Sequence, residues 1–291
     1  MNMLELNWKG AAQKINYHGP MSIQWVLLCL QRFLHMFKFF RIFILLLIFA
    51  GVALGAWREK TRSVEWKYTL PVNVYPINAD GSEVTAEYIH SLKPDDFKPI
   101  EKFMKDEAAR YGRDSHASIE IKLGSAITKL PPSPPHSANP LEIILWSLQM
   151  RWWSFRHAET YGPGPQVKLF LLYFDPASRS RLGHSTGLQK GLLGNVNLYA
   201  AHDMAGSNNV VIVHEFLHTL GATDKYDLMN NQPIYPDGYA IPDQTPLLPQ
   251  RFAEIMAGRI PISENKAEIP TGLNETLIGE KTAREINWVS L

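Results

Sequence analysis

Residues 210–224 read VVIVHEFLHTLGATD, and this stretch is the most informative part of the chain about fold and function. Residues 210–220 are mainly apolar and long enough for a helix that is buried on nearly every side. His214 and His218 are four residues apart, so a helix would present both imidazoles on one face. Two imidazoles in that arrangement can bind one metal ion, and Glu215 can then approach a water molecule on that ion.

The pattern continues beyond the second histidine. Gly221 follows His218 by three residues, and Asp224 follows Gly221 by three. A glycine there can adopt a positive φ and end the helix, which lets the chain turn back and bring Asp224 to the metal. With this composition, chance produces the complete spacing in roughly one sequence in ten thousand. The alternative is a pair of core histidines that are hydrogen-bonded within the fold.

The ligand set has a chemical consequence. Three protein ligands leave a fourth position for water, as in catalytic rather than structural zinc sites. Two nitrogens and one oxygen suit Zn²⁺ without excluding other metals. We therefore predict that His214, His218 and Asp224 hold one Zn²⁺ and that Glu215 acts as the general base.

With these residues in place, the sequence resembles the metzincin clan of zinc endopeptidases, whose motif is H-E-x-x-H-x-x-G-x-x-H/D. The aspartate at the last position is similar to that of the snapalysin-type branch. The resemblance implies a zincin-like α+β fold, two subdomains that flank a cleft, and hydrolysis of a peptide or protein substrate. It also implies a methionine-containing turn beneath the metal. Met256 is the best match for that turn, because Met229 follows the motif too closely.

The resemblance further implies that an edge strand before the active-site helix pairs with extended substrate. We assign this role to the strand predicted at 195–201. Its substrate-binding residues are predicted to be Asn195, Val196, Asn197, Leu198 and Tyr199. Several metzincins carry an oxyanion-binding tyrosine two residues after the turn methionine, where this chain has Gly258. Four substitutes stay open, namely His184, His202, Tyr226 and Arg259.

The rest of the sequence predicts an α+β fold, in which a mixed sheet carries helices and a small irregular C-terminal subdomain ends in a helix. Apolar alternation and apolar runs predict strands at 70–77, 118–127, 166–175 and 195–201. Helices are predicted at 94–111, 139–161, 210–220 and 280–288.

Two finer predictions concern the helices. Trp146, Trp152 and Trp153 of the second helix are expected to pack in the core or between subdomains. The helix that carries the histidines is expected to have an N-cap among residues 207–209, which are Ser, Asn and Asn.

A separate apolar segment lies near the N-terminus. Residues 42–57 read IFILLLIFAGVALGAW, without a charge, and basic residues flank the run. We interpret 36–58 as a transmembrane signal-anchor or signal peptide that connects the protein to a membrane. Residues 1–35 are then a segment outside the mature protein if translation starts later. A linker at 59–67 leads to a metallopeptidase domain at 68–291, divided into subdomains 68–221 and 222–291.

This interpretation predicts a catalytic domain on the outer side of the membrane, periplasmic or extracellular. Cleavage near Gly55, which would release a secreted protein, is an alternative, and a buried core helix is another.

Composition excludes several classes of function. The 291 residues carry 29 Lys and Arg against 28 Asp and Glu, so the net charge of +1 gives no reason to expect a nucleic-acid partner. Cys29 is the single cysteine, which excludes a disulfide framework and a cysteine-rich zinc module. No cysteine lies within the predicted catalytic domain, and on this ground we do not expect control by a cysteine-switch propeptide.

Other sequence features are compatible with functions other than a peptidase. Residues 183–187 read GHSTG and match the G-x-S-x-G elbow of serine hydrolases with Ser185 as nucleophile, but neither a preceding strand nor a following helix adjoins it. A non-catalytic membrane-anchored protein that keeps a zinc fold is a second alternative. Asp227, Asp237 and Asp243 could hold Ca²⁺, but their spacing is irregular and favours solvated turn residues.

Overall fold

The structure is a computed structural model, and it describes residues 38–51, 54, 64–113, 118–135, 139–160, 166–189 and 192–289. The chain divides into two compact units, Met1–Leu54 and Gly55–Leu291. In the first unit, residues 38–51 are helical and all of their side chains are exposed.

The described helices include none with both the length and the apolarity needed to cross a membrane. The predicted segment 1–35 lies outside the described residues, as do parts of 36–58 and of the linker 59–67. The membrane anchor therefore stays a prediction.

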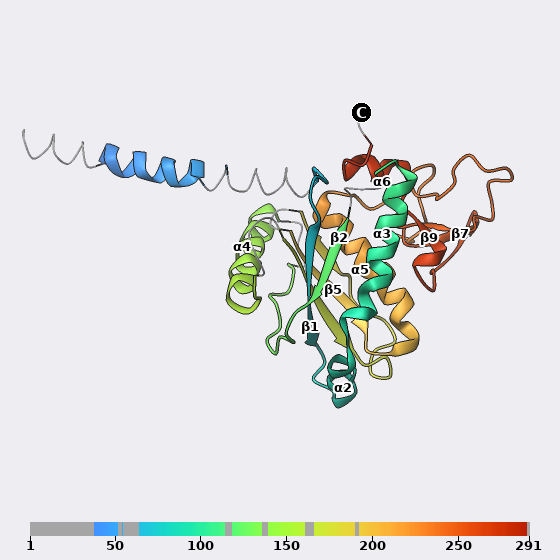
Figure 1. Cartoon of the computed structure of the whole chain (residues 1–291), viewed down its shortest axis with the longest axis horizontal. Helices are drawn as coiled ribbons and strands as arrows, with labels where there is room; N and C mark the ends of the chain where they lie inside the picture. Colours follow the sequence, from blue (N-terminus) through green and yellow to red (C-terminus); the bar gives the residue numbers. More distant parts are fainter. Residues whose placement is uncertain are drawn as a thin grey trace, which may run out of the picture. The chain divides into compact units, whose positions relative to one another are not determined.

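The second unit is built around a five-stranded mixed sheet (Figure 1). Its strands are β1 (Leu70–Asn78), β2 (Ile119–Leu123), β3 (Val167–Phe174), β4 (Thr186–Leu188) and β5 (Leu193–Tyr199), in the order β2-β1-β3-β5-β4. Neighbours are parallel except for β4, which runs antiparallel to β5. The mixed sheet with its helices confirms the α+β class.

Helices cover both faces of this sheet. The connection from β1 to β2 contains α2 (Glu83–Ser91), a 3₁₀ turn (Pro94–Phe97) and α3 (Lys98–Arg110), and the connection from β2 to β3 contains α4 (Pro140–His157). Figure 1 shows α4 on the side opposite to α3 and α5 (Ala205–Leu220). Right-handed crossovers explain this, because the chain steps from β1 to β2 in one direction and back across β1 to β3 in the other.

The core follows the alternation of side chains along the strands. Val72 and Val74 of β1 point into the larger cluster, which includes the buried faces of α3 and α5. Tyr75 and Ile77 of the same strand point into the smaller cluster beneath α4. The five strands therefore have a buried core on both faces, which is why β1 and β3 are nearly continuous apolar runs.

The C-terminal part contains only short elements. They are β6 (Ala253–Glu254), β7 (Ile260–Ser263), β8 (Lys266–Glu268), a 3₁₀ turn (Leu273–Glu275), β9 (Thr276–Leu277) and α6 (Glu280–Glu285). The described residues therefore show the expected irregular C-terminal region with a final helix, but Gly55–Leu291 is one compact unit, and the division into subdomains 68–221 and 222–291 stays a prediction. A buried carboxylate, that of Glu254, accepts hydrogen bonds from the N–H groups of Met256, Ala257 and Gly279 and from the hydroxyl of Thr282.

The prediction of Asn195–Tyr199 as the edge strand is wrong, although the strand itself is β5. β4 pairs with the first half of β5 and is the edge strand in its place. The amide of Asn197 donates to Ser185 Oγ, and Asn208 of α5 bonds both backbone groups of Tyr199. β4 has three residues with a glycine at the centre, which is too short for a periodicity signal.

Three details of the helices differ from expectation. α5 begins at Ala205, and its N-cap is Met204 without a side-chain hydrogen bond, because Asn208 is engaged by β5 instead. Trp152 is 63% exposed, whereas Trp146 and Trp153 are buried as expected. The short helix α2 was not predicted, since its sequence has few apolar positions at helical spacing.

Gly221 ends α5 at φ 110° and ψ 6°, as its place in the motif predicts. An alanine there would be forced into the left-handed region, and its Cβ would collide with Nε2 of Gln189. We expect Gly221→Ala to lower the free energy of unfolding by about 1–2 kcal/mol in urea titrations.

Gly183→Ala is the matched control, because the nearest atom to its added Cβ is 3.9 Å away. It should change the free energy of unfolding by less than about 1 kcal/mol. Equal effects of the two substitutions would contradict the assigned conformational role of Gly221.

Candidate metal centre

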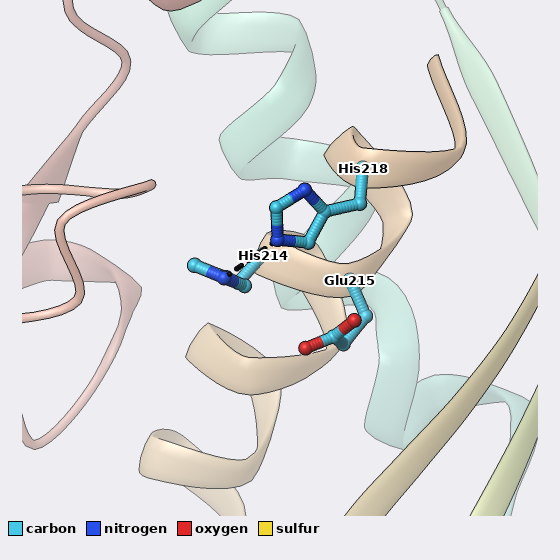
Figure 2. A group of neighbouring side chains, drawn as sticks. All are labelled: His214, Glu215 and His218. Carbon is cyan, nitrogen blue, oxygen red and sulfur yellow. Dashed lines mark hydrogen bonds between the residues drawn. The ribbon is translucent and has the colours of Figure 1, made fainter. Parts of the chain in front are cut away.

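The centre of the site is one face of α5. His214, Glu215 and His218 bring their ligand atoms within 4.8 Å of one another, and Figure 2 shows the two rings directed toward each other, with Glu215 beside them. The two Nε2 atoms are 3.1 Å apart. Helical spacing alone produces this pairing, because residues i and i+4 lie one above the other on the helix surface.

Asp224 reaches the same point from the turn after α5. The left-handed Gly221 reverses the chain, and the amide of Ala222 donates back to the carbonyl of Leu217. Asp224 Oδ1 then lies 3.1 Å from Nε2 of His214 and 3.1 Å from Nε2 of His218. The structure therefore brings together all three residues that the sequence predicts as metal ligands.

Backbone carbonyls orient both rings. His214 Nδ1 lies 3.0 Å from the carbonyl oxygen of Ile255, and His218 Nδ1 lies 2.8 Å from that of Ala222. A carbonyl oxygen only accepts, so each Nδ1 carries the hydrogen, and the Nε2 atom of each ring, which faces Asp224, is left to bind a proton or a metal ion. Such second-ring hydrogen bonds are the usual support of metal-binding histidines.

This donor set fits a zinc ion. Three acceptor atoms, two Nε2 and one carboxylate oxygen, stand at the corners of a triangle with 3.1 Å sides. Ligands held tetrahedrally at roughly 2.0–2.1 Å from one zinc ion lie about 3.3 Å apart, which is close to this spacing. Neutral imidazoles and a carboxylate also suit the borderline-soft character of Zn²⁺.

The electrostatics of the site point to the same requirement for a positive charge. Burial lowers the pKa of His214, but its hydrogen bond to Asp224 and the charge of Glu215 raise that pKa to about 9. Burial raises the pKa of Asp224, yet hydrogen bonds from His214 and His218 hold it well below its ordinary value. Asp224 therefore stabilises a positive charge at this point, which is either a proton on a histidine or a metal ion.

Glu215 lies beside this triangle in a confined space. One of its oxygens accepts the amide hydrogen of Gly187, while Oε2 is buried and has no hydrogen-bond partner among the described residues. Burial raises the pKa of Glu215, against the opposing effect of the two histidines. A carboxylate with a raised pKa and a free oxygen is suited to accept a proton.

The edge strand β4 runs directly against this part of α5. A Cβ on Gly187 would lie 2.5 Å from the Cβ of His218 and 2.7 Å from the carbonyl oxygen of Glu215. Only a glycine allows this approach, so the sheet edge and the histidines are adjacent. Gly187 was not predicted as a site residue, because a glycine within GHSTG carries no local signal of its long-range contact.

A buried ion pair holds the chain on both sides of Asp224. The Glu285 carboxylate of α6 accepts from the amide and the hydroxyl of Thr223 at 3.0 and 2.7 Å, and from Lys225 Nζ at 2.7 Å. The Lys225 side chain is only 3% exposed. These residues were also missed, because the 60 positions between Lys225 and Glu285 hide their contact from sequence inspection.

Met256 is fully buried in the core cluster that includes α5. The residue before it supplies the carbonyl that orients His214, and its own carbonyl accepts the amide of Lys225. The turn at Met256 therefore contacts the ring of His214 and the backbone of Lys225. Its role beneath a metal stays a prediction.

The other candidate residues lie in different surroundings. Ser185 precedes the strand β4 rather than a helix, and its hydroxyl accepts the amide of Asn197. Among the four oxyanion candidates, Tyr226 has its ring centroid 6.4 Å from that of His214. Asp227 accepts the amide of Met229, as a turn residue does. Only one group of three metal-capable side chains occurs in the described part of the chain, that on α5.

Comparison with known proteins adds no family assignment, since no protein-family model and no curated protein matches this chain.

The Glu285 interactions predict a role in positioning Asp224. Glu285→Gln removes the charge that pairs with Lys225 and leaves a buried cation, so we expect a loss of about 3 kcal/mol in the free energy of unfolding. Zinc affinity, measured by competition with a chromogenic chelator, should fall severalfold.

Glu280→Gln on the same helix is the control. Its pair with Arg284 is exposed. The free energy of unfolding and the free energy of zinc binding should therefore both stay within about 0.5 kcal/mol of wild type. Unchanged zinc affinity in Glu285→Gln would show that Asp224 keeps its position without this ion pair.

Proposed function

We propose that the protein is a zinc-dependent peptidase of metzincin type, and an endopeptidase in particular. The observation that carries the proposal is the convergence of His214, His218 and Asp224 at 3.1 Å spacing, beside the buried carboxylate of Glu215. The α+β sheet, the glycine-ended helix and the buried turn at Met256 support the metzincin assignment.

In this proposal His214, His218 and Asp224 hold the metal. A zinc ion bound there would lower the pKa of a water molecule toward ~7 and polarise the scissile carbonyl. Glu215 accepts the proton of the attacking water at its free oxygen and then donates it to the leaving amine. Its raised pKa favours the first of these steps, because a carboxylate with a raised pKa is a stronger base than an ordinary glutamate.

Tyr226 is the favoured residue for stabilising the oxyanion. It follows Asp224 by two positions, and its ring lies next to that of His214. Burial and the carboxylates of Asp224 and Glu215 raise the pKa of its phenol, so it keeps its hydrogen at neutral pH and can donate it.

We assign the substrate-binding strand to β4 instead of Asn195–Tyr199. β4 is the free edge of the sheet and lies against the turn of α5 that carries Glu215 and His218. An extended peptide added to this edge would pass beside the metal site. The wider proposal includes a membrane anchor at 36–58 with the catalytic unit on the outer side.

Glu215→Gln tests the chemistry. Purified wild-type protein should contain about one zinc ion per chain by elemental analysis and should cleave a casein or peptide-library substrate. Glu215→Gln should keep the zinc and lose at least about a hundredfold in kcat, because the proton acceptor is gone. His218→Ala should lose the metal.

Three results would contradict the proposal. Zinc content unaffected by replacing His214 and His218 together would refute the site. If the wild type binds zinc but hydrolyses no peptide, and Glu215→Gln gives the same two results, the protein would instead be a non-catalytic binding protein. Inhibition by a serine-directed phosphonate but not by a chelator would indicate Ser185 instead.

Tyr226→Phe tests the oxyanion assignment. Loss of one donor that acts mainly in the transition state should lower kcat by about 10²–10³-fold with little change in KM. Tyr235→Phe is the control, because that ring is 56% exposed and packs edge-on against Tyr239. A KM increase without a kcat decrease in Tyr226→Phe would assign Tyr226 to ground-state binding.

A further inference from the structure

The outward face of α4 is apolar over its full length. Six large side chains on this face are each more than half exposed, and none of them carries a charge. Apart from two adjacent residues, they are spaced by three or four positions, which places them along one stripe of the helix. We call them the α4 stripe: Leu141, Ile144, Leu145, Leu148, Trp152 and Phe155.

The stripe is additional to the face of α4 that the fold needs. Trp146, Met150 and Trp153 are buried on the other side of the helix and pack on the sheet. The helix is therefore already anchored without the stripe. Single exposed apolar side chains are ordinary, but a continuous stripe of six is an interaction surface.

The residues that border the stripe have the chemistry of a membrane surface. At 3.6 residues per turn, Arg156 falls on one flank of it, and its side chain is exposed. The guanidinium of Arg156 lies 5.9 Å from the ring centroid of Trp152. Tryptophan and phenylalanine beside arginine are typical of helices that lie in the interface of a bilayer, with the arginines extended to the headgroups.

A second feature of the chain favours a bilayer over a second copy of the protein. Residues 38–51 form another helix with exposed apolar side chains, in the same polypeptide. Ten residue steps join Leu54 to Val64, and such a connection spans at most about 36 Å. A bilayer that received the first helix would thus lie within reach of the second unit.

We propose that α4 docks on a lipid bilayer, with the α4 stripe in the interface and Arg156 at the headgroups. This surface is independent of the zinc chemistry, since it lies on the face of the sheet opposite to α5. The full chain would then contact the membrane at two places.

Site-directed spin labelling tests the proposal on the full chain. Cys29→Ser removes the native thiol, and Leu148→Cys then carries the label on the stripe. The matched control is Lys105→Cys, an exposed position on α3, on the other side of the sheet. Both proteins are reconstituted with vesicles of phosphatidylcholine and phosphatidylglycerol in equal amounts, and circular dichroism verifies that each is folded.

The ratio of accessibility to oxygen over accessibility to a water-soluble nickel complex reports immersion in lipid. We expect this ratio to be severalfold higher for the label at 148 than for the label at 105, and to fall to the control value when Ile144→Glu places a charge on the stripe. Equal ratios at 148 and 105 would overturn the proposal. Strong dipolar coupling between labels at 148 on separate chains, with no rise in oxygen accessibility, would overturn it in favour of self-association.

Discussion

The two hydrogen bonds from the histidine rings to backbone carbonyls are the constraint on which the site depends. The carbonyl of Ala222 comes from the turn that ends α5, and the carbonyl of Ile255 comes from the distant C-terminal part. Together they direct both Nε2 atoms toward the carboxylate of Asp224. The geometry of the candidate metal site therefore depends on both parts of the second unit and cannot form on α5 alone.

Buried carboxylates make this arrangement rigid where regular structure is sparse. Backbone amides in an irregular segment have no ladder of partners, and leaving them buried and unpaired is costly. Glu254 accepts two amides in the turn at Met256, and Glu107 of α3 accepts the amide of Ile278. Burial raises the pKa of Glu254 and of Glu107, against the hydrogen bonds that favour their ionised forms.

Apart from the hydrogen bond between His218 and Ala222, the interactions that position the site join residues far apart in sequence. Glu285 bonds Thr223 and Lys225 across some sixty positions, and Gly187 allows β4 to approach α5 across about thirty. Nothing in local periodicity distinguishes these residues from surface acids and loop glycines. The sequence therefore indicates the candidate ligands but not the distant residues that position them.

The accuracy of the sequence predictions follows the same division. The strand β3 and the helix α5 were recognised because burial on both sides produces apolar runs. The strand β1 was recognised from its apolar alternation. The edge strand was misassigned because β4 is only three residues long. Trp152 was expected in the core because its residue type favours burial, whereas its position on α4 directs it outward.

The sequence by itself determined the i, i+4 pair of histidines, the glycine that ends the helix and the acid that follows. Local geometry suffices for these, because helical spacing and a left-handed turn bring nearby residues together. Only the tertiary structure decided which strand is the sheet edge, which carbonyls orient the rings and which carboxylate flanks Asp224. Those features depend on contacts between segments that chain spacing leaves free, and the packing of the whole unit selects one arrangement.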